Sequence, residues 1–103
     1  MKFGLFYQLP CAPEQSEATR YRETVEQVVL ADEIGFDVAW LAELHFFQPF
    51  SIMPAPLILA TAIAQRTRRI RLGTGVSLLP FHHPLRLAEE AATVDILSDG
   101  RLD

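Results

Sequence analysis

The sequence has 103 residues, of which 50% are hydrophobic and 21% are charged, and 9 Lys and Arg against 13 Asp and Glu give a net charge of −4. This composition is too apolar for a disordered segment, and the acidic balance argues against a nucleic-acid partner. The single cysteine, Cys11, excludes an internal disulfide. No apolar run reaches the ~18 residues of a membrane span, and the N-terminus lacks a signal-peptide core, so we expect a cytoplasmic protein without membrane contact.

Strand and helix patterns alternate along the chain. The predicted strands are short and largely apolar, and they span residues 2–7, 37–42 and 70–76. The predicted helices follow them and begin at Glu17, around Pro54 and Pro56, and at Pro84. Ser16 is a suitable N-cap for the first helix and Gly35 a suitable stop. Residues 101–103 have the character of the start of a fourth strand.

Three βα units in succession predict parallel strands joined by helical crossovers. Such a sheet alone would keep two open edges and one poorly covered face, whereas a complete eight-unit barrel takes ~250 residues. We therefore expect an α/β fold in which residues 1–103 form the N-terminal three βα units of a (β/α)₈ TIM barrel. In this interpretation they are one part of a single domain, truncated before the fourth strand. The alternative is a self-contained three-layer α/β domain closed by dimerisation.

Catalytic groups in a parallel barrel collect at the carboxyl ends of the strands. Glu43 and His45 directly follow the second predicted strand. His45 is a candidate proton donor or acceptor, or else a side chain that bonds nearby backbone and packs against Phe46. Glu43 either orients His45, binds a polar ligand group, or is a solvated carboxylate at the start of a loop.

Two further patterns lie near the third strand. The Gly73–Thr74–Gly75 stretch lacks the spacing of a phosphate-binding loop, but its glycines would let a flat ligand approach the backbone, or they mark a tight turn. His82 and His83 are adjacent, so their side chains diverge, and no third ligand stands at zinc-like spacing. We therefore predict no metal site. For His83, which precedes Pro84 at the start of the third predicted helix, we favour a structural role.

Four stretches together resemble the bacterial luciferase-like family of flavin-dependent monooxygenases and oxidoreductases, namely residues 1–6, 35–46, 69–80 and 83–90. The resemblance covers essentially the whole chain. It implies a monooxygenase that uses reduced FMN and O₂ on a small organic substrate and receives its flavin from a separate reductase. A homodimer is left open. The alternatives are a deazaflavin-dependent dehydrogenase on the same barrel, and a non-catalytic fragment or interaction module.

The resemblance also implies roles for individual residues. The catalytic candidates Glu43 and His45 match the acidic and second-histidine positions of the family's E-H-H-F stretch. Leu44 stands at the first histidine, which serves as a base in light-emitting members, so light emission is not expected here. The implied cofactor-binding residues are Ala42, Thr74, Gly75 and Val76, with a non-proline cis bond at Gly75–Val76. The implied substrate pocket contains Tyr7, Leu44 and Phe46. The isolated chain is expected to be inactive and of low stability, because most of the barrel and its phosphate site are missing.

Overall fold

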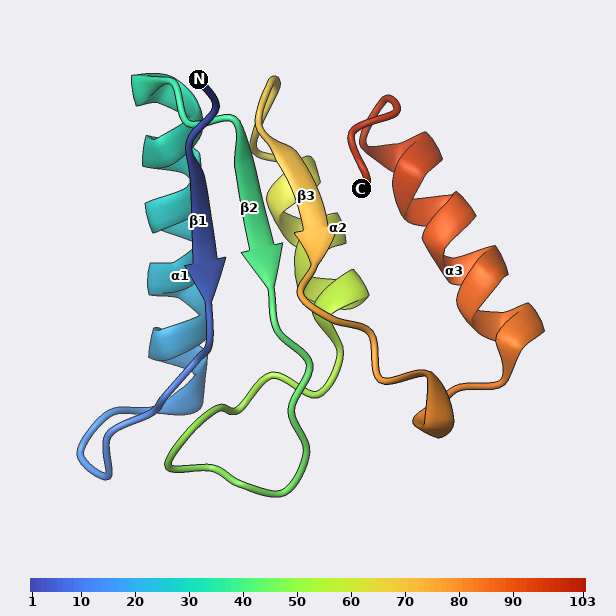
Figure 1. The fold of residues 1–103 in the computed structure, drawn as a ribbon. Coiled ribbons are helices and arrows are strands. Elements are labelled where there is room, and N and C mark those ends of the chain that lie inside the picture. Colours follow the sequence, from blue (N-terminus) through green and yellow to red (C-terminus); the bar gives the residue numbers. More distant parts are fainter.

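The computed structural model describes residues 1–103, and its three strands form one parallel sheet in the order β1-β2-β3 (Figure 1). The strands are β1 (Gly4–Tyr7), β2 (Val38–Leu41) and β3 (Arg71–Thr74). The helices are α1 (Glu17–Ile34), α2 (Pro56–Ala64) and α3 (Pro84–Leu97), with a short 3₁₀ helix η1 (Leu79–Phe81) before α3. The predicted order and parallel pairing are confirmed. Each strand is shorter than predicted, because all three overlap in register over only four positions.

The longest helix, α1, begins and ends where the sequence predicted. The Ser16 hydroxyl accepts a hydrogen bond from the Thr19 N–H at 3.1 Å, which satisfies one of the unpaired donors of the first turn. At the other end Gly35 adopts a φ of 102°, which costs a residue without Cβ very little. Its N–H donates to the Ala31 carbonyl and closes the helix. None of the helices combines the length and the apolar character needed to cross a membrane.

The core lies between the sheet and the helices α1 and α2, which cover one of its faces (Figure 1). Leu5, Ala39 and Leu72 pair across the three strands in one row on this face. They pack with Val28 of α1 and Ile63 of α2, both of which are fully buried. Removing these apolar side chains from water is the main force that holds the helices on the sheet.

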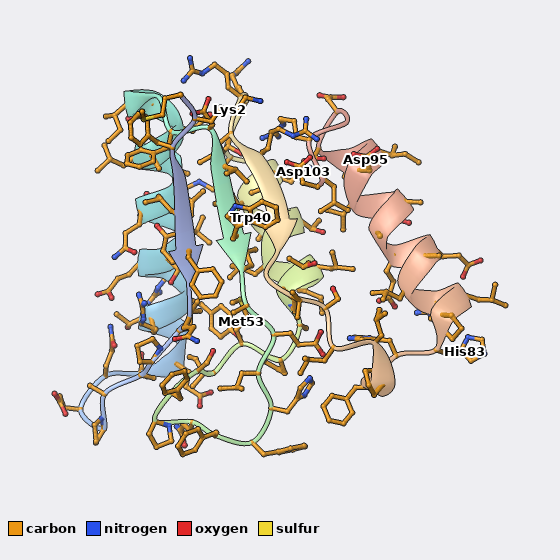
Figure 2. The ribbon with its side chains drawn as sticks, in the orientation of Figure 1. Lys2, Trp40, Met53, His83, Asp95 and Asp103 are labelled. Atoms are coloured by element: carbon orange, nitrogen blue, oxygen red, sulfur yellow. The ribbon has the colours of Figure 1, made fainter.

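The opposite face of the sheet carries no helix, and its central row is Phe6, Trp40 and Gly73 (Figure 2). Phe6 is 61% exposed. A Cβ atom at Gly73 would lie 2.3 Å from Cζ3 of Trp40, so the indole ring rests directly on the glycine backbone. Because α1 and α2 cover one face only, the chain by itself has two layers.

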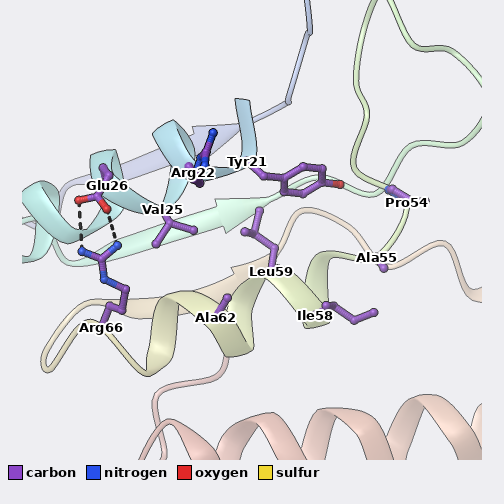
Figure 3. A pocket seen from close by; sticks show the side chains of 10 residues that line it. All are labelled: Tyr21, Arg22, Val25, Glu26, Pro54, Ala55, Ile58, Leu59, Ala62 and Arg66. Atoms are coloured by element: carbon purple, nitrogen blue, oxygen red, sulfur yellow. Dashed lines mark hydrogen bonds and ion pairs between the residues drawn. The ribbon is translucent and has the colours of Figure 1, made fainter. Parts of the chain in front are cut away.

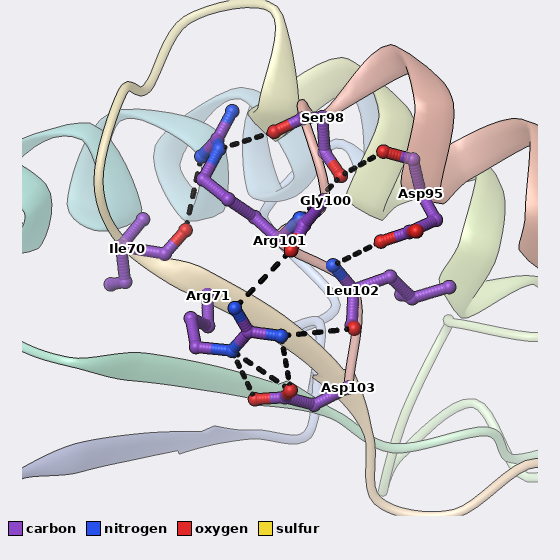
Figure 4. Close-up of polar contacts among 8 residues, drawn as sticks. All are labelled: Ile70, Arg71, Asp95, Ser98, Gly100, Arg101, Leu102 and Asp103. Carbon is purple, nitrogen blue, oxygen red and sulfur yellow. Dashed lines mark hydrogen bonds and ion pairs between the residues drawn. The ribbon is translucent and has the colours of Figure 1, made fainter.

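After α3 the chain returns to the open edge of the sheet beside β3. Leu102 forms a parallel bridge with Leu72, and the Leu72 N–H donates to the Arg101 carbonyl at 2.8 Å. The Asp103 carboxylate accepts three hydrogen bonds from Nε and Nη2 of the Arg71 guanidinium (Figure 4). The predicted start of a fourth strand is therefore present as a single parallel β-bridge.

The buried guanidinium of Arg101 connects this segment to the helix ends. It donates to the carbonyl oxygens of Ser98 at 2.6 Å and Ile70 at 3.0 Å (Figure 4). It also donates to the Ala64 carbonyl at 2.9 Å and to the Thr67 hydroxyl. The last carbonyls of a helix have no partner within it and carry partial negative charge. Arg101 satisfies such groups near the ends of α2 and α3, without a carboxylate.

A second buried charge, Asp32 of α1, holds the turn that leads into β3. Its carboxylate accepts from the backbone N–H groups of Arg68 at 2.8 Å, Arg69 at 3.0 Å and Ile70 at 2.7 Å. Burial by itself raises the pKa of Asp32, but these bonds and the Arg69 charge outweigh it and leave the pKa below its ordinary value. Asp32 thus sets where β3 begins.

Asp32→Asn is expected to lower the free energy of unfolding by about 1–3 kcal/mol at pH 7, because an amide group places a donor against a buried N–H. A depressed folded-state pKa means that the ionised group stabilises the fold above the ordinary Asp value of ~3.9, and that this contribution is lost as the pH falls through the folded-state pKa. The difference in the free energy of unfolding between wild type and Asp32→Asn should therefore become smaller as the pH falls. Urea unfolding from pH 7 to pH 3 measures both effects. Glu33→Gln, at the exposed neighbouring position, is the control.

Gly73→Ala is expected to force the Trp40 ring off the sheet, since the new methyl group would overlap it. We expect the free energy of unfolding to fall by about 1–3 kcal/mol, the usual cost of overpacking a protein core. The fluorescence emission spectrum of the chain's single tryptophan should also change. The double variant Trp40→Ala/Gly73→Ala should be no less stable than Trp40→Ala alone. Unchanged emission and stability in Gly73→Ala would contradict the contact.

Candidate functional site

The carboxyl ends of the three strands lie at one edge of the sheet, where the loops that follow β2 and β3 run side by side (Figure 1). The first loop spans residues 42–55 and the second spans residues 75–83. Contacts between these loops form the candidate site. These loops lie close together because β2 and β3 are neighbouring parallel strands.

Glu43 is the centre of the contacts between the loops, and its side chain is fully buried. Its Oε1 atom accepts a hydrogen bond from Nε2 of His45 at 2.6 Å, and both carboxylate oxygens lie 2.9 Å from Nε2 of His82. The backbone N–H of Leu78 donates to Oε2 at 2.8 Å. The predicted pairing of Glu43 with His45 is therefore present, and the reading of Glu43 as a solvated carboxylate is wrong.

These hydrogen bonds decide the charge of Glu43. Burial by itself would raise its pKa, but the bonds from His45, His82 and the Leu78 N–H outweigh burial and hold the pKa below the ordinary value. Glu43 is therefore a carboxylate at neutral pH, with a donor on each side. A buried carboxylate without such donors would cost several kcal/mol.

His82 joins this cluster, although the sequence did not make it a catalytic candidate. It lies 39 residues from Glu43 in the chain, directly after η1, and the sequence pattern argued only against a metal site at His82 and His83. One signal could have found it. Parallel neighbouring strands place the loops after β2 and β3 at the same edge, so a histidine in one loop can reach a carboxylate in the other.

Aromatic side chains flank His45. The Phe81 ring lies edge-on to it, with centroids 4.9 Å apart and planes at 70°. Phe46, which follows His45, has a φ of 56° and is fully exposed, with its centroid 6.1 Å from the imidazole. His45 bonds to Glu43 and not to backbone, so the Glu43 carboxylate and the Phe81 ring hold it in place.

Hydrogen bonds to the body of the protein fix the loop that carries Glu43 and His45. The Ser51 hydroxyl accepts from the N–H groups of Leu9 and Met53, both at 3.2 Å and both buried. The Leu44 N–H donates to the Met53 carbonyl at 3.1 Å, which closes the loop on itself. Tyr21 of α1 donates its hydroxyl to the Ile52 carbonyl. The loop is therefore a built part of the fold.

Residues 74–76 form a partly exposed strip of backbone that continues from the end of β3. The Gly75–Val76 peptide bond is cis, as the sequence resemblance implied. The Gly75 N–H donates to the Leu41 carbonyl at 2.8 Å, and the Val76 side chain is 62% exposed. A Cβ atom at Gly75 would lie 3.0 Å from the Phe6 ring. Glycine therefore lets the backbone lie close to this ring. Such a surface fits a flat aromatic ring system.

The other predicted site residues take different positions. Ala42 is buried next to Glu43, and Leu44 is half-buried on the wall of the hollow that also contains His45 and Phe46. Tyr7 packs against the core on the helix-covered face, where burial raises its pKa. Because side chains alternate along a strand, the β1 side chain on the open face is Phe6. The implied place of Tyr7 in a substrate pocket stays a prediction.

An apolar groove on the other side of the molecule lies between α1 and α2 (Figure 3). Val25, Leu59 and Ile58 line it, and an ion pair between Arg66 and Glu26 crosses one end. It contains no histidine. The polar groups that could do proton chemistry therefore gather at the carboxyl edge of the sheet, and no group of three or more His, Cys, Asp and Glu is arranged to hold a metal ion.

The comparison with known families now has a structural context. A family model described as "Luciferase-like monooxygenase" matches residues 1–103. The chain belongs to the luciferase-like monooxygenase family. A curated relative, the oxygenase component of flavin-dependent trigonelline monooxygenase from Acinetobacter baylyi, is 39% identical over 104 residues, which are 100% of this chain and 29% of the relative.

Several solved structures share this fold. Monooxygenase RslO1 from Streptomyces bottropensis superposes with a TM-score of 0.94 at 40% identity, over 100% of this chain and 32% of that one. The oxygenating constituent of 3,6-diketocamphane monooxygenase from Pseudomonas putida, in complex with FMN, superposes with a TM-score of 0.91 at 28% identity. The match covers 99% of this chain and 28% of that one. The F420-dependent tetrahydromethanopterin reductase from Methanopyrus kandleri gives 0.74 at 25% identity, over 98% and 25%. This luciferase-like chain spans about a third or less of these proteins.

Ser51→Ala is expected to destabilise the loop that carries Glu43 and His45. It leaves two buried N–H groups without an acceptor, at a cost of about 1–3 kcal/mol. Amide hydrogen exchange should become faster at Leu9 and Met53, the two donors. Ser77→Ala, in the neighbouring loop, is the control, because no hydrogen bond to the Ser77 hydroxyl is lost. Unchanged exchange at both amides would show that the loop does not depend on Ser51.

Proposed function

We propose that this chain forms the N-terminal part of a flavin-dependent monooxygenase that uses reduced FMN and O₂ to oxidise a small organic substrate. The observation that carries the proposal is the flat backbone strip at Gly75–Val76, beside the buried Glu43 with its two histidines. The family, the flavin-dependent relative and the neighbour solved with FMN all support it. The remainder of the barrel, including a site for the flavin phosphate, would come from a longer chain.

The residues present suit a flavin ring and a substrate next to it. Ala42, Thr74, Gly75 and Val76 would hold the ring at the carboxyl edge of the sheet, with backbone and not charged side chains against it. The reduced cofactor would supply the electrons that activate O₂. Leu44 and Phe46 would line the substrate pocket and exclude water, while Glu43 holds His45 and His82 in place.

A separate flavin reductase is the proposed partner. The relative from Acinetobacter baylyi is named as an oxygenase component, which supports a two-component arrangement for this chain. We expect reduced flavin to arrive from solution, so the complete enzyme should consume O₂ only when a reductase and its electron donor are present.

A deazaflavin-dependent dehydrogenase is the second candidate, because the Methanopyrus kandleri neighbour uses coenzyme F420 on a related fold. Identity and TM-score are both lower for that neighbour than for RslO1, which favours the monooxygenase. The two are separated by assay of the product of the complete reading frame. Oxygen uptake with FMN and a flavin reductase supports the monooxygenase, whereas substrate oxidation with the deazaflavin under anaerobic conditions would replace it.

Val76→Asp is expected to weaken binding of reduced FMN to the product of the complete reading frame. A carboxylate on the strip would repel the electron-rich reduced ring and the phosphate, and we expect a loss of about tenfold or more in affinity, or about 1.4 kcal/mol. Anaerobic titration measures it. Leu79→Asp is the control, because Leu79 is equally exposed but lies three residues further on, in η1. Equal weakening by both variants would argue against the strip as the flavin site.

A further inference from the structure

The hydrogen bonds around Glu43 constrain the proton positions on both histidines. A carboxylate can only accept hydrogen bonds, so any ring nitrogen within bonding distance of it must carry a hydrogen. Nε2 is that nitrogen in both rings, at 2.6 Å for His45 and 2.9 Å for His82. When an imidazole is neutral it has one N–H, and its other nitrogen keeps a lone pair.

We propose that Glu43 is a positioning residue that fixes His45 and His82 as Nε2–H tautomers, so that the Nδ1 atoms of both rings are the proton acceptors offered to a ligand. His82 thereby becomes a second acceptor in the site. The proposal deepens the proposed function, on which it rests for the nature of the ligand, but the tautomers themselves can be tested without flavin or turnover.

The environment leaves Nδ1 available in both rings. Neither Nδ1 atom has a hydrogen-bond partner within the chain, and the two side chains keep 21% and 26% of their surface exposed, whereas the Glu43 side chain keeps none. Phe81 packs against His45 through its ring and offers no polar atom. Glu17 of α1 is the other titratable group on the wall of the hollow beside His45, and it accepts a hydrogen bond from Gln48 at 3.2 Å.

This arrangement selects the chemistry of the ligand group. In the proposed tautomers, two Nδ1 lone pairs near a buried carboxylate suit a hydroxyl or N–H donor and disfavour a carboxylate. The exposed Phe46 beside His45 suits an apolar body. The substrate class that fits is therefore an organic molecule with a hydrogen-bond-donating group on an apolar or aromatic frame.

Nitrogen-15 NMR reads tautomers directly, since bare and protonated ring nitrogens resonate far apart. The protein from the complete reading frame would be labelled in its histidines and measured at a pH where imidazoles are neutral. His45→Gln and His82→Gln assign the two rings. Both rings are expected to show a protonated Nε2 and a bare Nδ1. His83, which is exposed and does not contact Glu43, is the internal control. Its two ring nitrogens should show chemical shifts averaged over the two tautomers.

Glu43→Gln sharpens the test, because the amide has one acceptor oxygen and one NH₂ donor. The Leu78 N–H still needs an acceptor, so the amide oxygen should take the place of Oε2 and the NH₂ should face His45. His45 is then expected to switch to the Nδ1–H tautomer, while His82, which also contacts Oε2, keeps its Nε2–H.

Averaged signals for His45 or His82 in the wild type, or a His45 that stays Nε2–H in Glu43→Gln, would overturn the positioning role. Phenol should shift the Nδ1 resonance of His45 or His82, with sodium benzoate at the same concentration as the control. A shift with benzoate, or with neither compound, would overturn the ligand class. Failure of the proposed function would appear instead as a lack of flavin binding and of oxygen uptake, with the tautomers unchanged.

Discussion

The parallel register of the three strands is the constraint on which the rest of the structure depends. Gly4, Val38 and Arg71 pair at one end of the sheet, and Tyr7, Leu41 and Thr74 at the other, so all three strands leave the sheet at the same edge. The loop after β2 therefore meets the loop after β3. A shift of one residue in either pairing would turn a strand's buried side chains to the open face and separate the loops.

Buried charges in this chain are held by hydrogen-bond donors or acceptors on every side. Glu43 has two imidazoles and a backbone N–H, Asp32 has three backbone N–H groups, and Arg101 has carbonyl oxygens near the ends of α2 and α3. No buried polar side-chain atom lacks a partner. Each cluster joins segments that are distant in the chain, so the cost of burying the charge is offset by contacts that also fix the fold.

The open face of the sheet places the fold in its family context. Phe6 and Trp40 pair in one row on the face that no helix covers, and the chain spans only 29% of its curated relative from Acinetobacter baylyi. In a complete barrel, the inward face of each strand packs against the other strands. An uncovered aromatic row is therefore what three units of a luciferase-like barrel would present. The proposed flavin strip lies at the carboxyl end of this face.

The sequence by itself determined the local structure: the alternation of strands and helices, the Ser16 cap and Gly35 stop of α1, and the placement of Glu43 and His45 after β2. Its resemblance to the family also indicated the cis bond at Gly75–Val76. These features depend on neighbouring residues or on a shared motif. Only the tertiary structure decided that His82 joins Glu43 and which face of the sheet is left without helices. Those outcomes depend on strand register and loop path, which bring together residues as many as 39 positions apart and leave no periodic trace in the sequence.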